Sequence, residues 1–223
     1  AILNILNHQS LIATKAARIC YAAEGDGIME FGLRRAQGPD AGIYGARAAV
    51  IGGCAGTSNV LTGQMFDVPV MGTHAHSWIM SFDDEYTAFY TYAKLYPMAC
   101  TLLVDTYDTL NSGVPNAIKV FKQMKKEGIE LKNYGIRLDS GDLAYLSKKA
   151  RKMLDDAGFK DATITASNDL DEFLIASLKM QGAEITNWGV GTNLITSKDC
   201  PSFGGVYKLA AIMEDGENFT PKI

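Results

Sequence analysis

Apolar positions along the chain alternate between a helical spacing and a strand-like spacing. The first run, ILNHQSLIATKAARICYAAEG, has its apolar residues at helical spacing and ends at Gly25, which predicts a helix. A later helix is expected to begin after an N-cap at Ser81 and to end at Pro97. From Ala99 onward, amphipathic helices separate predicted buried strands in ACTLLVDTYDT, NYGIRLDSGD, ATITASNDLD and AEITNWGVGTNLITS, and GGVYKLAAI is predicted to follow as a further strand.

This alternation favours an α/β fold with a mostly parallel sheet. The predicted strands are rich in β-branched and aliphatic residues, which is typical of strands buried on both faces. Each of them ends in a cluster of polar residues, and in a barrel such strand ends converge on one mouth. An open sheet would instead concentrate its chemistry at a single switch point. We therefore expect an irregular, TIM-like α/β barrel in which residues 1–223 form one domain.

Composition and charge exclude several classes of protein. The 47% of hydrophobic and 21% of charged residues are typical of a globular protein rather than a disordered or fibrous one. No apolar run reaches the roughly 18 residues that a membrane span requires. The net charge of -4 and the scattered basic residues argue against a nucleic-acid partner. Four cysteines without a CxxC pair indicate reduced thiols in a cytoplasmic protein. With no initiating methionine, the chain is expected to be a piece of a longer protein.

Two predicted strand ends carry side chains suited to anions and hydroxyl groups. Phe31 and Arg34 leave one strand together, so an aromatic ring stands beside a guanidinium group that can bind a carboxylate or phosphate. The alternative is an ordinary surface ion pair. Arg137 and Asp139 leave another strand, where the carboxylate can accept hydrogen bonds from ribose and the arginine can meet an anion.

Two later loops are suited to phosphate. Ser167 and Asn168 are expected at a helix start, where free N–H groups attract anions, although a simple helix cap would have the same sequence. Gly191 and Thr192 follow the next strand, and glycine lets backbone N–H groups approach phosphate oxygens. Taken together, these loops and the preceding charged pairs predict a phosphorylated sugar as ligand.

The run THAHS contains two of the three histidines, and three interpretations compete for them. A zinc pair at His74 and His76 is disfavoured because no histidine follows them and His8 lies in the first helix, so no metal site is predicted. His74 is compatible with an ordinary core histidine. His76 is favoured as a nucleophile or general base, positioned by an acid such as Asp105.

Five motifs in matching order resemble the nicotinate phosphoribosyltransferase family: EFGLRRAQGPD, GTSNVLTGQMFDVPVMGTHAHSWIMSF, LLVDTYDT, GIRLDSGDL and WGVGTNLIT. The resemblance implies the irregular α/β barrel of the type II phosphoribosyltransferases, preceded by an N-terminal domain, in a homodimer with active sites at the subunit interface. It implies conversion of nicotinate and phosphoribosyl pyrophosphate to nicotinate mononucleotide and pyrophosphate in NAD salvage, with Mg²⁺ as cofactor. ATP would be a co-substrate, hydrolysed through a phosphohistidine. The N-terminal domain and a C-terminal part are expected to be absent from this chain.

The resemblance also implies roles for individual residues. His76 resembles the histidine that ATP phosphorylates, and Asp105 the acid that hydrogen-bonds it. The other matching positions are implied to bind substrate: Arg34 and Arg137 the ligand anions, Phe31 the pyridine ring, Asp139 the ribose, and Ser167, Asn168, Gly191 and Thr192 the 5′-phosphate.

Ser58 bears on the choice of substrate. It occupies a position where relatives that use nicotinamide have an aspartate. A carboxylate there would repel nicotinate, whereas a hydroxyl can donate to it. Nicotinamide phosphoribosyltransferase, the quinolinate enzyme and a non-catalytic phosphosugar-binding barrel remain the alternatives.

Overall fold

The computed structural model describes residues 2–213 and 216–221, and its centre is a six-stranded parallel sheet. The strand order is β2-β1-β6-β5-β4-β3, and every pairing within this sheet is parallel. The strands are β1 (Gly27–Glu30), β2 (Gly56–Thr57), β3 (Thr101–Leu103), β4 (Gly135–Leu138), β5 (Thr163–Ala166) and β6 (Asn187–Val190). The mostly parallel α/β fold predicted from the sequence is therefore confirmed.

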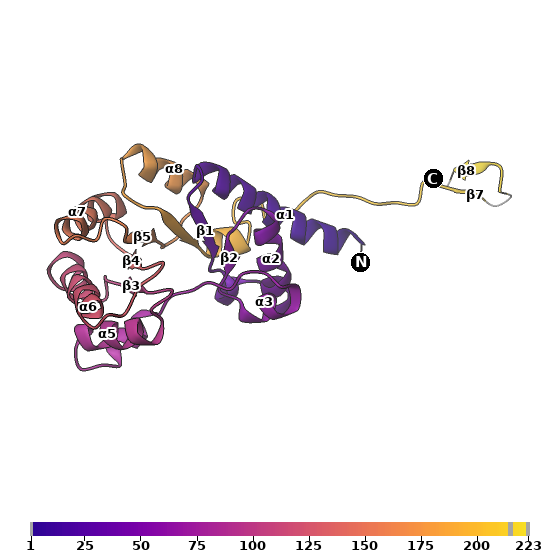
Figure 1. The fold of residues 1–223 in the computed structure, drawn as a ribbon. Coiled ribbons are helices and arrows are strands. Elements are labelled where there is room, and N and C mark those ends of the chain that lie inside the picture. The colour runs from indigo at the N-terminus through magenta and orange to yellow at the C-terminus, as the bar shows by residue number, and fades with distance from the viewer. Residues whose placement is uncertain (1, 214–215, 222–223) are drawn as a thin grey trace.

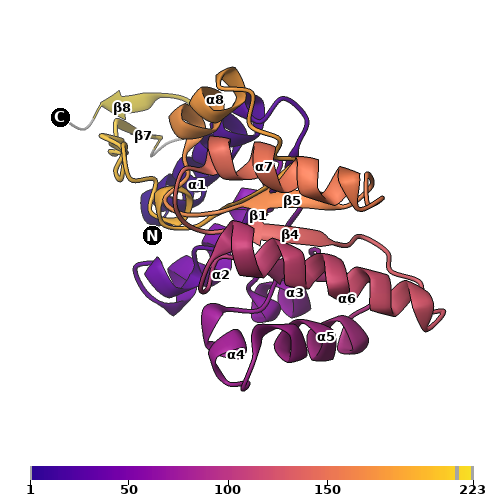
Figure 2. The same ribbon diagram turned by 90° about the vertical axis from the view of Figure 1, so that its left-hand side faces the viewer.

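Helices cover the sheet from outside and connect its strands. They are α1 (Ile2–Ala22), α2 (Pro39–Ile51), α3 (Val60–Phe66), α4 (His76–Met80), α5 (Glu85–Leu95), α6 (Val114–Lys126), α7 (Leu143–Asp156), α8 (Glu172–Met180) and α9 (Thr192–Ile195), with short turns η1 (Leu33–Arg35) and η2 (Thr109–Gly113). In Figure 1, α1, α2 and α3 gather beside β1 and β2, whereas α5, α6 and α7 lie at the other end of the sheet. Figure 2 shows α6 and α7 side by side along β4 and β5.

The local sequence explains where the helices begin. Asp84, Asp142 and Asp171 each accept a hydrogen bond from a backbone N–H in the first turn of the helix that follows, at 2.8, 3.0 and 2.8 Å. The expected N-cap at Ser81 is wrong, because Asp84 caps α5 and Ser81 instead ends α4. An aspartate next to the helix start competes better for the free N–H groups than a serine three residues earlier.

The hydrophobic core lies between the sheet and these helices. Strand residues such as Leu102, Ile136, Ile164 and Trp188 are almost fully buried. They pack with helical residues that include Phe89, Phe121 and Leu154. Because parallel strands share one direction, their carboxyl ends form a single edge where the connecting loops meet.

The sheet is not a closed barrel in the described part of the chain. No strand ladder joins the edge strands β2 and β3 there. The connection after α3 instead runs along β2, since the Thr57 N–H donates to Pro69 O at 3.0 Å and the Met71 N–H donates to Thr57 O at 2.9 Å.

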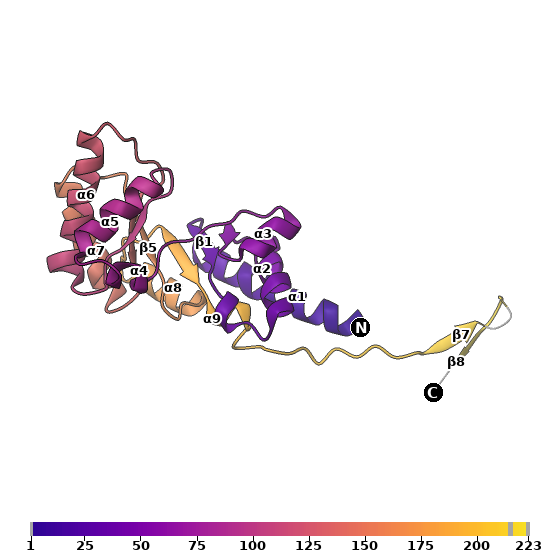
Figure 3. The ribbon, with the colours of Figure 1, turned by 90° about the horizontal axis from the view of Figure 1, so that it is seen from below.

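The end of the described chain leaves the body of the molecule. Residues 201–210 form no helix or strand, and Figures 1 and 3 show this segment running away from the sheet. Beyond it, β7 (Ala211–Met213) and β8 (Phe219–Pro221) pair antiparallel in a separate two-stranded sheet. GGVYKLAAI, predicted as a further strand of the series, has only its last two residues in a strand, and that strand pairs with β8 outside the main sheet. Val206, Tyr207 and Leu209 of this run are exposed.

No helix within residues 2–213 or 216–221 is both long and apolar enough to span a bilayer.

Candidate active site

The predicted site residues gather around two adjoining cavities at the carboxyl ends of the strands. The first cavity, of about 420 Å³, is lined by residues that include Phe31, Arg34, Ser58, His76, Arg137 and Asp139. The second, of about 170 Å³, shares four of these residues and adds Ser167, Asn168, Gly191 and Thr192. Asp105 lines neither cavity and lies behind the first, with its side chain 1% exposed. The fold thus brings together residues separated by up to 161 positions in the sequence.

His76 is the first residue of α4, and its two ring nitrogens have different surroundings. Nδ1 lies 3.0 Å from the hydroxyl of Thr106. Nε2 faces two carboxylates, at 3.6 Å from Asp139 Oδ2 and 3.9 Å from Asp105 Oδ1. The imidazole is therefore held between a neutral hydroxyl and a pair of acids.

The hydrogen bond expected between Asp105 and His76 is not formed in this structure, because 3.9 Å is beyond hydrogen-bonding distance. Asp105 Oδ2 instead accepts hydrogen bonds from the Asp139 N–H at 2.8 Å and from the Ser140 hydroxyl at 2.6 Å. Its Oδ1 is buried without a partner in the described chain. Asp105 thus fixes the turn that carries Asp139 and keeps one oxygen free on the His76 side.

Arg137 organises the floor of the site through three hydrogen bonds. Its guanidinium donates to Ser167 Oγ at 2.8 Å, Thr73 Oγ1 at 2.7 Å and Asp139 Oδ1 at 2.9 Å. The guanidinium carbon also lies 5.4 Å from the centre of the Phe31 ring, within cation–π range. These contacts join three strand ends into one rigid surface.

Asp139 stays ionised in this network. Burial opposes ionisation, but the hydrogen bond from Ser167 and the positive charge of Arg137 outweigh it and lower the pKa of the carboxyl group. An ionised carboxylate at this position can accept hydrogen bonds from ligand hydroxyl groups.

Arg34 and Ser58 lie on the other side of the first cavity. Arg34 belongs to the short turn η1 after β1, and Ser58 follows β2 directly. Neither side chain has a hydrogen-bond partner among the residues that the structure describes. Both are therefore available to a ligand, unlike Arg137.

The second cavity is bordered by a sharp turn after β5. Asn168 and Asp169 have positive φ angles of 94° and 46°, which turn the chain sharply after β5. The Asn193 amide holds this turn by donating to Asp169 O at 2.8 Å and to Leu170 O at 3.1 Å. Ser167 and Asn168 precede α8, which starts at Glu172, so the expectation that they stand at a helix start is wrong.

Gly189 packs closely against the Phe31 ring. A Cβ atom at this position would lie 2.7 Å from the Phe31 ring, closer than side chains tolerate. The glycine therefore allows β6 to pack directly under the aromatic wall of the first cavity.

His74 is a core histidine, in agreement with one of the three interpretations. Its side chain is buried, and its ring makes an edge contact with Tyr92 at 4.6 Å between centroids. Nε2 accepts a hydrogen bond from the Leu103 N–H at 3.2 Å. Burial lowers the pKa of His74 to about 4. The ring is thus neutral and pairs with an edge of β3 that no strand of the described chain covers.

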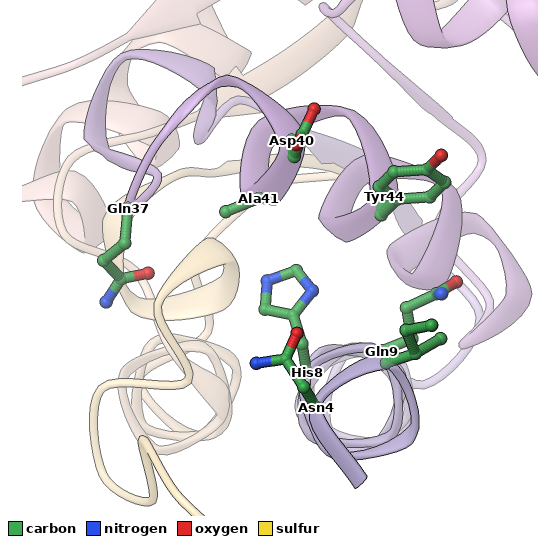
Figure 4. A pocket seen from close by; sticks show the side chains of 8 residues that line it. Asn4, His8, Gln9, Gln37, Asp40, Ala41 and Tyr44 are labelled. Carbon is green, nitrogen blue, oxygen red and sulfur yellow. The ribbon is translucent and has the colours of Figure 1, made fainter. Parts of the chain in front are cut away.

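His8 lies far from the other two histidines, in a separate cavity of about 550 Å³ between α1 and α2. Figure 4 shows its ring projecting from α1 toward Ala41 of α2, with Asn4 and Gln9 on the same helix. Within residues 2–213 and 216–221, no group of three or more His, Cys, Asp or Glu side chains is arranged to hold a metal ion on its own.

Sequence reasoning missed Thr73, Thr106, Thr57 and Glu30, which bind or support the predicted residues. Thr106 directly follows Asp105, and Thr73 directly precedes His74. Thr106 and Thr73 both lie inside the quoted motifs, next to predicted site residues, and this position could have indicated that they belong to the site. Threonine is, however, common in strands without any functional role, and the sequence does not show that Glu30 is buried.

Comparison with known proteins now identifies the family. The family model described as the nicotinate phosphoribosyltransferase (NAPRTase) family matches residues 27–218. The chain belongs to this family. It is 59% identical to a nicotinate phosphoribosyltransferase of Bacillus subtilis over 217 residues, covering 97% of this chain and 44% of that protein. It is 33% identical to the human nicotinate phosphoribosyltransferase, covering 95% of this chain and 49% of that protein.

Solved structures agree with this family membership. The fold is similar to the crystal structure of human nicotinic acid phosphoribosyltransferase, with a TM-score of 0.77 and 32% identity over 85% of this chain and 48% of that one. It is also similar to nicotinate-nucleotide pyrophosphorylase from Pyrococcus furiosus, with a TM-score of 0.74 and 28% identity over 88% of this chain and 49% of that one. The chain thus spans about half the length of the relatives it matches.

Proposed function

We propose that this chain carries the active-site half of a nicotinate phosphoribosyltransferase of NAD salvage. The reaction forms nicotinate mononucleotide and pyrophosphate from nicotinate and phosphoribosyl pyrophosphate. The observation that carries the proposal is the first cavity, where Phe31, Arg34, Ser58, His76 and Asp139 meet in a chain of this family. The relatives that bear this name support the same reaction.

Nicotinate would bind beside Phe31, where the ring and the Arg137 guanidinium offer two flat surfaces. Its carboxylate would meet Arg34 and Ser58, whose side chains have no hydrogen-bond partner in the described chain. Nicotinamide is the weaker candidate substrate, because the hydroxyl of Ser58 suits a carboxylate and no acid faces that position from β2.

Phosphoribosyl pyrophosphate would extend from the first cavity into the second. Asp139 is suited to the ribose hydroxyls, since its carboxylate is ionised and partly exposed. The 5′-phosphate would lie against Ser167, Asn168, Gly191 and Thr192, which line the second cavity. Bond cleavage at the sugar then requires two anions held in place and stabilisation of the departing pyrophosphate.

Mg²⁺ fits the acidic side of this site. Asp105 Oδ1 is a buried oxygen without a hydrogen-bond partner among the described residues, and Asp139 adds a second carboxylate near it, both facing His76. Two carboxylates are a typical protein share of a Mg²⁺ site that phosphate oxygens complete. When bound, the ion would neutralise charge on the pyrophosphate.

ATP coupling would act through His76. Nε2 faces two carboxylates, which favour a proton on that nitrogen, so Nδ1 keeps the lone pair. Nδ1 would attack the γ-phosphorus of ATP, the bond to the ADP oxygen would break, and the proton would stay on Nε2. The Thr106 hydroxyl, which holds Nδ1 at 3.0 Å, would turn away as the phosphoryl group arrives.

The sheet would form part of an irregular, TIM-like barrel. Residues 69–71 pair with β2, and His74 bonds to the free edge of β3, so this segment already spans the space between the two edge strands. We further propose that residues 1–223 act as one barrel domain, and that the full-length protein is a cytoplasmic homodimer.

The test is turnover by the full-length protein with radiolabelled nicotinate, phosphoribosyl pyrophosphate, Mg²⁺ and ATP. We expect nicotinate mononucleotide to form faster with ATP than without it, and His76→Ala to lose only the ATP-stimulated part. His8→Gln is the matched control, since His8 lies between α1 and α2, outside the site. Absence of product from nicotinate, or preference for nicotinamide, would refute the proposal.

A further inference from the structure

Glu30 is a buried carboxylate without a cation. It ends β1 and is fully buried, and none of the ion pairs in the described part of the chain includes it. Burial raises the pKa of Glu30, although hydrogen bonds from Thr57 and Gly32 act in the opposite direction. Burying an acid in this way opposes folding unless its hydrogen bonds compensate.

Those hydrogen bonds lead to two different turns. Oε1 accepts the Gly32 N–H in the turn after β1. Oε2 accepts the hydroxyl of Thr57 at 2.6 Å, at the end of β2. The Thr57 Oγ1 in turn accepts the Asn59 N–H at 2.9 Å. One carboxylate therefore links the turn at residues 31–34 to the turn at residues 57–59.

Each of these two turns forms one wall of the first cavity. Phe31 and Arg34 belong to the first turn, and Ser58 to the second. The side chains of Arg34 and Ser58 have no partner of their own in the described chain, so their positions depend on the backbone below them. Gly32 shows how tightly this backbone is held, because a Cβ atom there would lie 2.8 Å from Glu30 Oε1 and 2.4 Å from Ile195 Cβ.

We propose that Glu30 is a positioning residue that fixes the separation between Arg34 and Ser58, and thereby the width of the slot for the pyridine carboxylate. This inference rests on the proposed function. Phe31 and Arg34 line both cavities, but the residues proposed to contact phosphoribosyl pyrophosphate follow β4, β5 and β6, and none of them is hydrogen-bonded to Glu30 or Thr57 in the described chain. Loosening the link should therefore weaken the use of nicotinate and spare the other substrate.

Thr57→Val in the full-length protein is the decisive variant, because valine keeps the shape of threonine and removes the bridging hydroxyl. Thr57→Ser is the matched control, since it keeps that hydroxyl. We expect Thr57→Val to raise the KM for nicotinate about tenfold or more, with kcat and the KM for phosphoribosyl pyrophosphate within about threefold of the unaltered protein. Thr57→Ser should stay within about threefold in all three constants.

Amide hydrogen exchange provides a readout that does not depend on activity. The segments 31–34 and 57–60 should both exchange faster in Thr57→Val and neither in Thr57→Ser. If Thr57→Val fails to fold, Glu30→Gln and Glu30→Met make the same comparison. Glutamine can still accept from Gly32 and donate to Thr57, whereas methionine can do neither.

The outcomes separate this inference from the proposed function. A folded Thr57→Val protein with an unchanged KM for nicotinate would overturn the role of Glu30, as would a parallel loss in both KM values and kcat. Unaltered protein that does not convert nicotinate would overturn the proposed function and the substrate assigned to this slot. The exchange data would in that case still decide whether Glu30 couples the two turns.

Discussion

Replacing His74 by glutamine should remove a pH-dependent part of the protein's stability. His74 is buried, and its Nε2 accepts the Leu103 N–H at 3.2 Å. A glutamine carbonyl oxygen can accept the same hydrogen bond, but it cannot take up a proton. The substitution therefore keeps the hydrogen bond to β3 and removes the titration; the ring contact with Tyr92 is lost at every pH and does not change the pH dependence.

The magnitude follows from the pKa. Burial lowers the pKa of His74 from 6.5 to about 4. As the pH falls below 6.5, the unfolded chain binds a proton at this position while the folded chain does not, so the free energy of unfolding decreases until the pH reaches about 4. At roughly 1.4 kcal/mol per pH unit, the full effect is about 3 kcal/mol.

Urea unfolding of both proteins at about pH 7 and about pH 4.5 measures this effect, and carboxyl groups common to both cancel in the comparison. We expect the unaltered protein to lose about 2 kcal/mol more than His74→Gln over this interval. His74→Leu is a second variant that leaves the Leu103 N–H unpaired, so it should cost roughly 1–3 kcal/mol at about pH 7. Equal pH dependence in the unaltered protein and His74→Gln would refute the reasoning.

Three further predictions concern the proposed active site. Thr106→Val should slow phosphorylation of His76 by ATP about fivefold to tenfold, because the ring loses the contact that orients it before ATP binds, whereas Thr106→Ser keeps that contact and should not. Phosphohistidine labelling over time measures this. Ser58→Asp should shift the ratio of kcat/KM for nicotinate and nicotinamide toward nicotinamide by about tenfold or more, and an unchanged ratio would remove Ser58 from the pyridine site. Arg137→Lys should raise the KM for phosphoribosyl pyrophosphate about tenfold or more, because an ammonium group cannot keep the three guanidinium contacts with Ser167, Thr73 and Asp139. Initial rates measured with nicotinate in excess test this prediction. A KM within about twofold of the unaltered protein would contradict it.

The parallel α/β architecture could be predicted from local patterns. The strands around Leu102, Ile136 and Ile164 are short aliphatic runs, and the helices between them are amphipathic with aspartate caps. Such signals lie within a few residues of one another, so the sequence reveals them directly. GGVYKLAAI has the same local appearance, yet it lies outside the main sheet, because pairing depends on partners distant in the sequence.

The amino-acid sequence by itself determined which residues are available at the strand ends. The quoted motifs contain His76, Asp105, Arg137 and Asp139, and the family follows from them. Only the tertiary structure decided how these residues are connected. In the structure, the Thr106 hydroxyl contacts Nδ1 of His76, and Asp105 accepts a hydrogen bond from the Asp139 N–H. His74 is buried in the core, where its Nε2 accepts the Leu103 N–H. These hydrogen bonds join residues that are 29 to 34 positions apart in the sequence. They require particular distances and angles, which arise only when the strands are packed side by side.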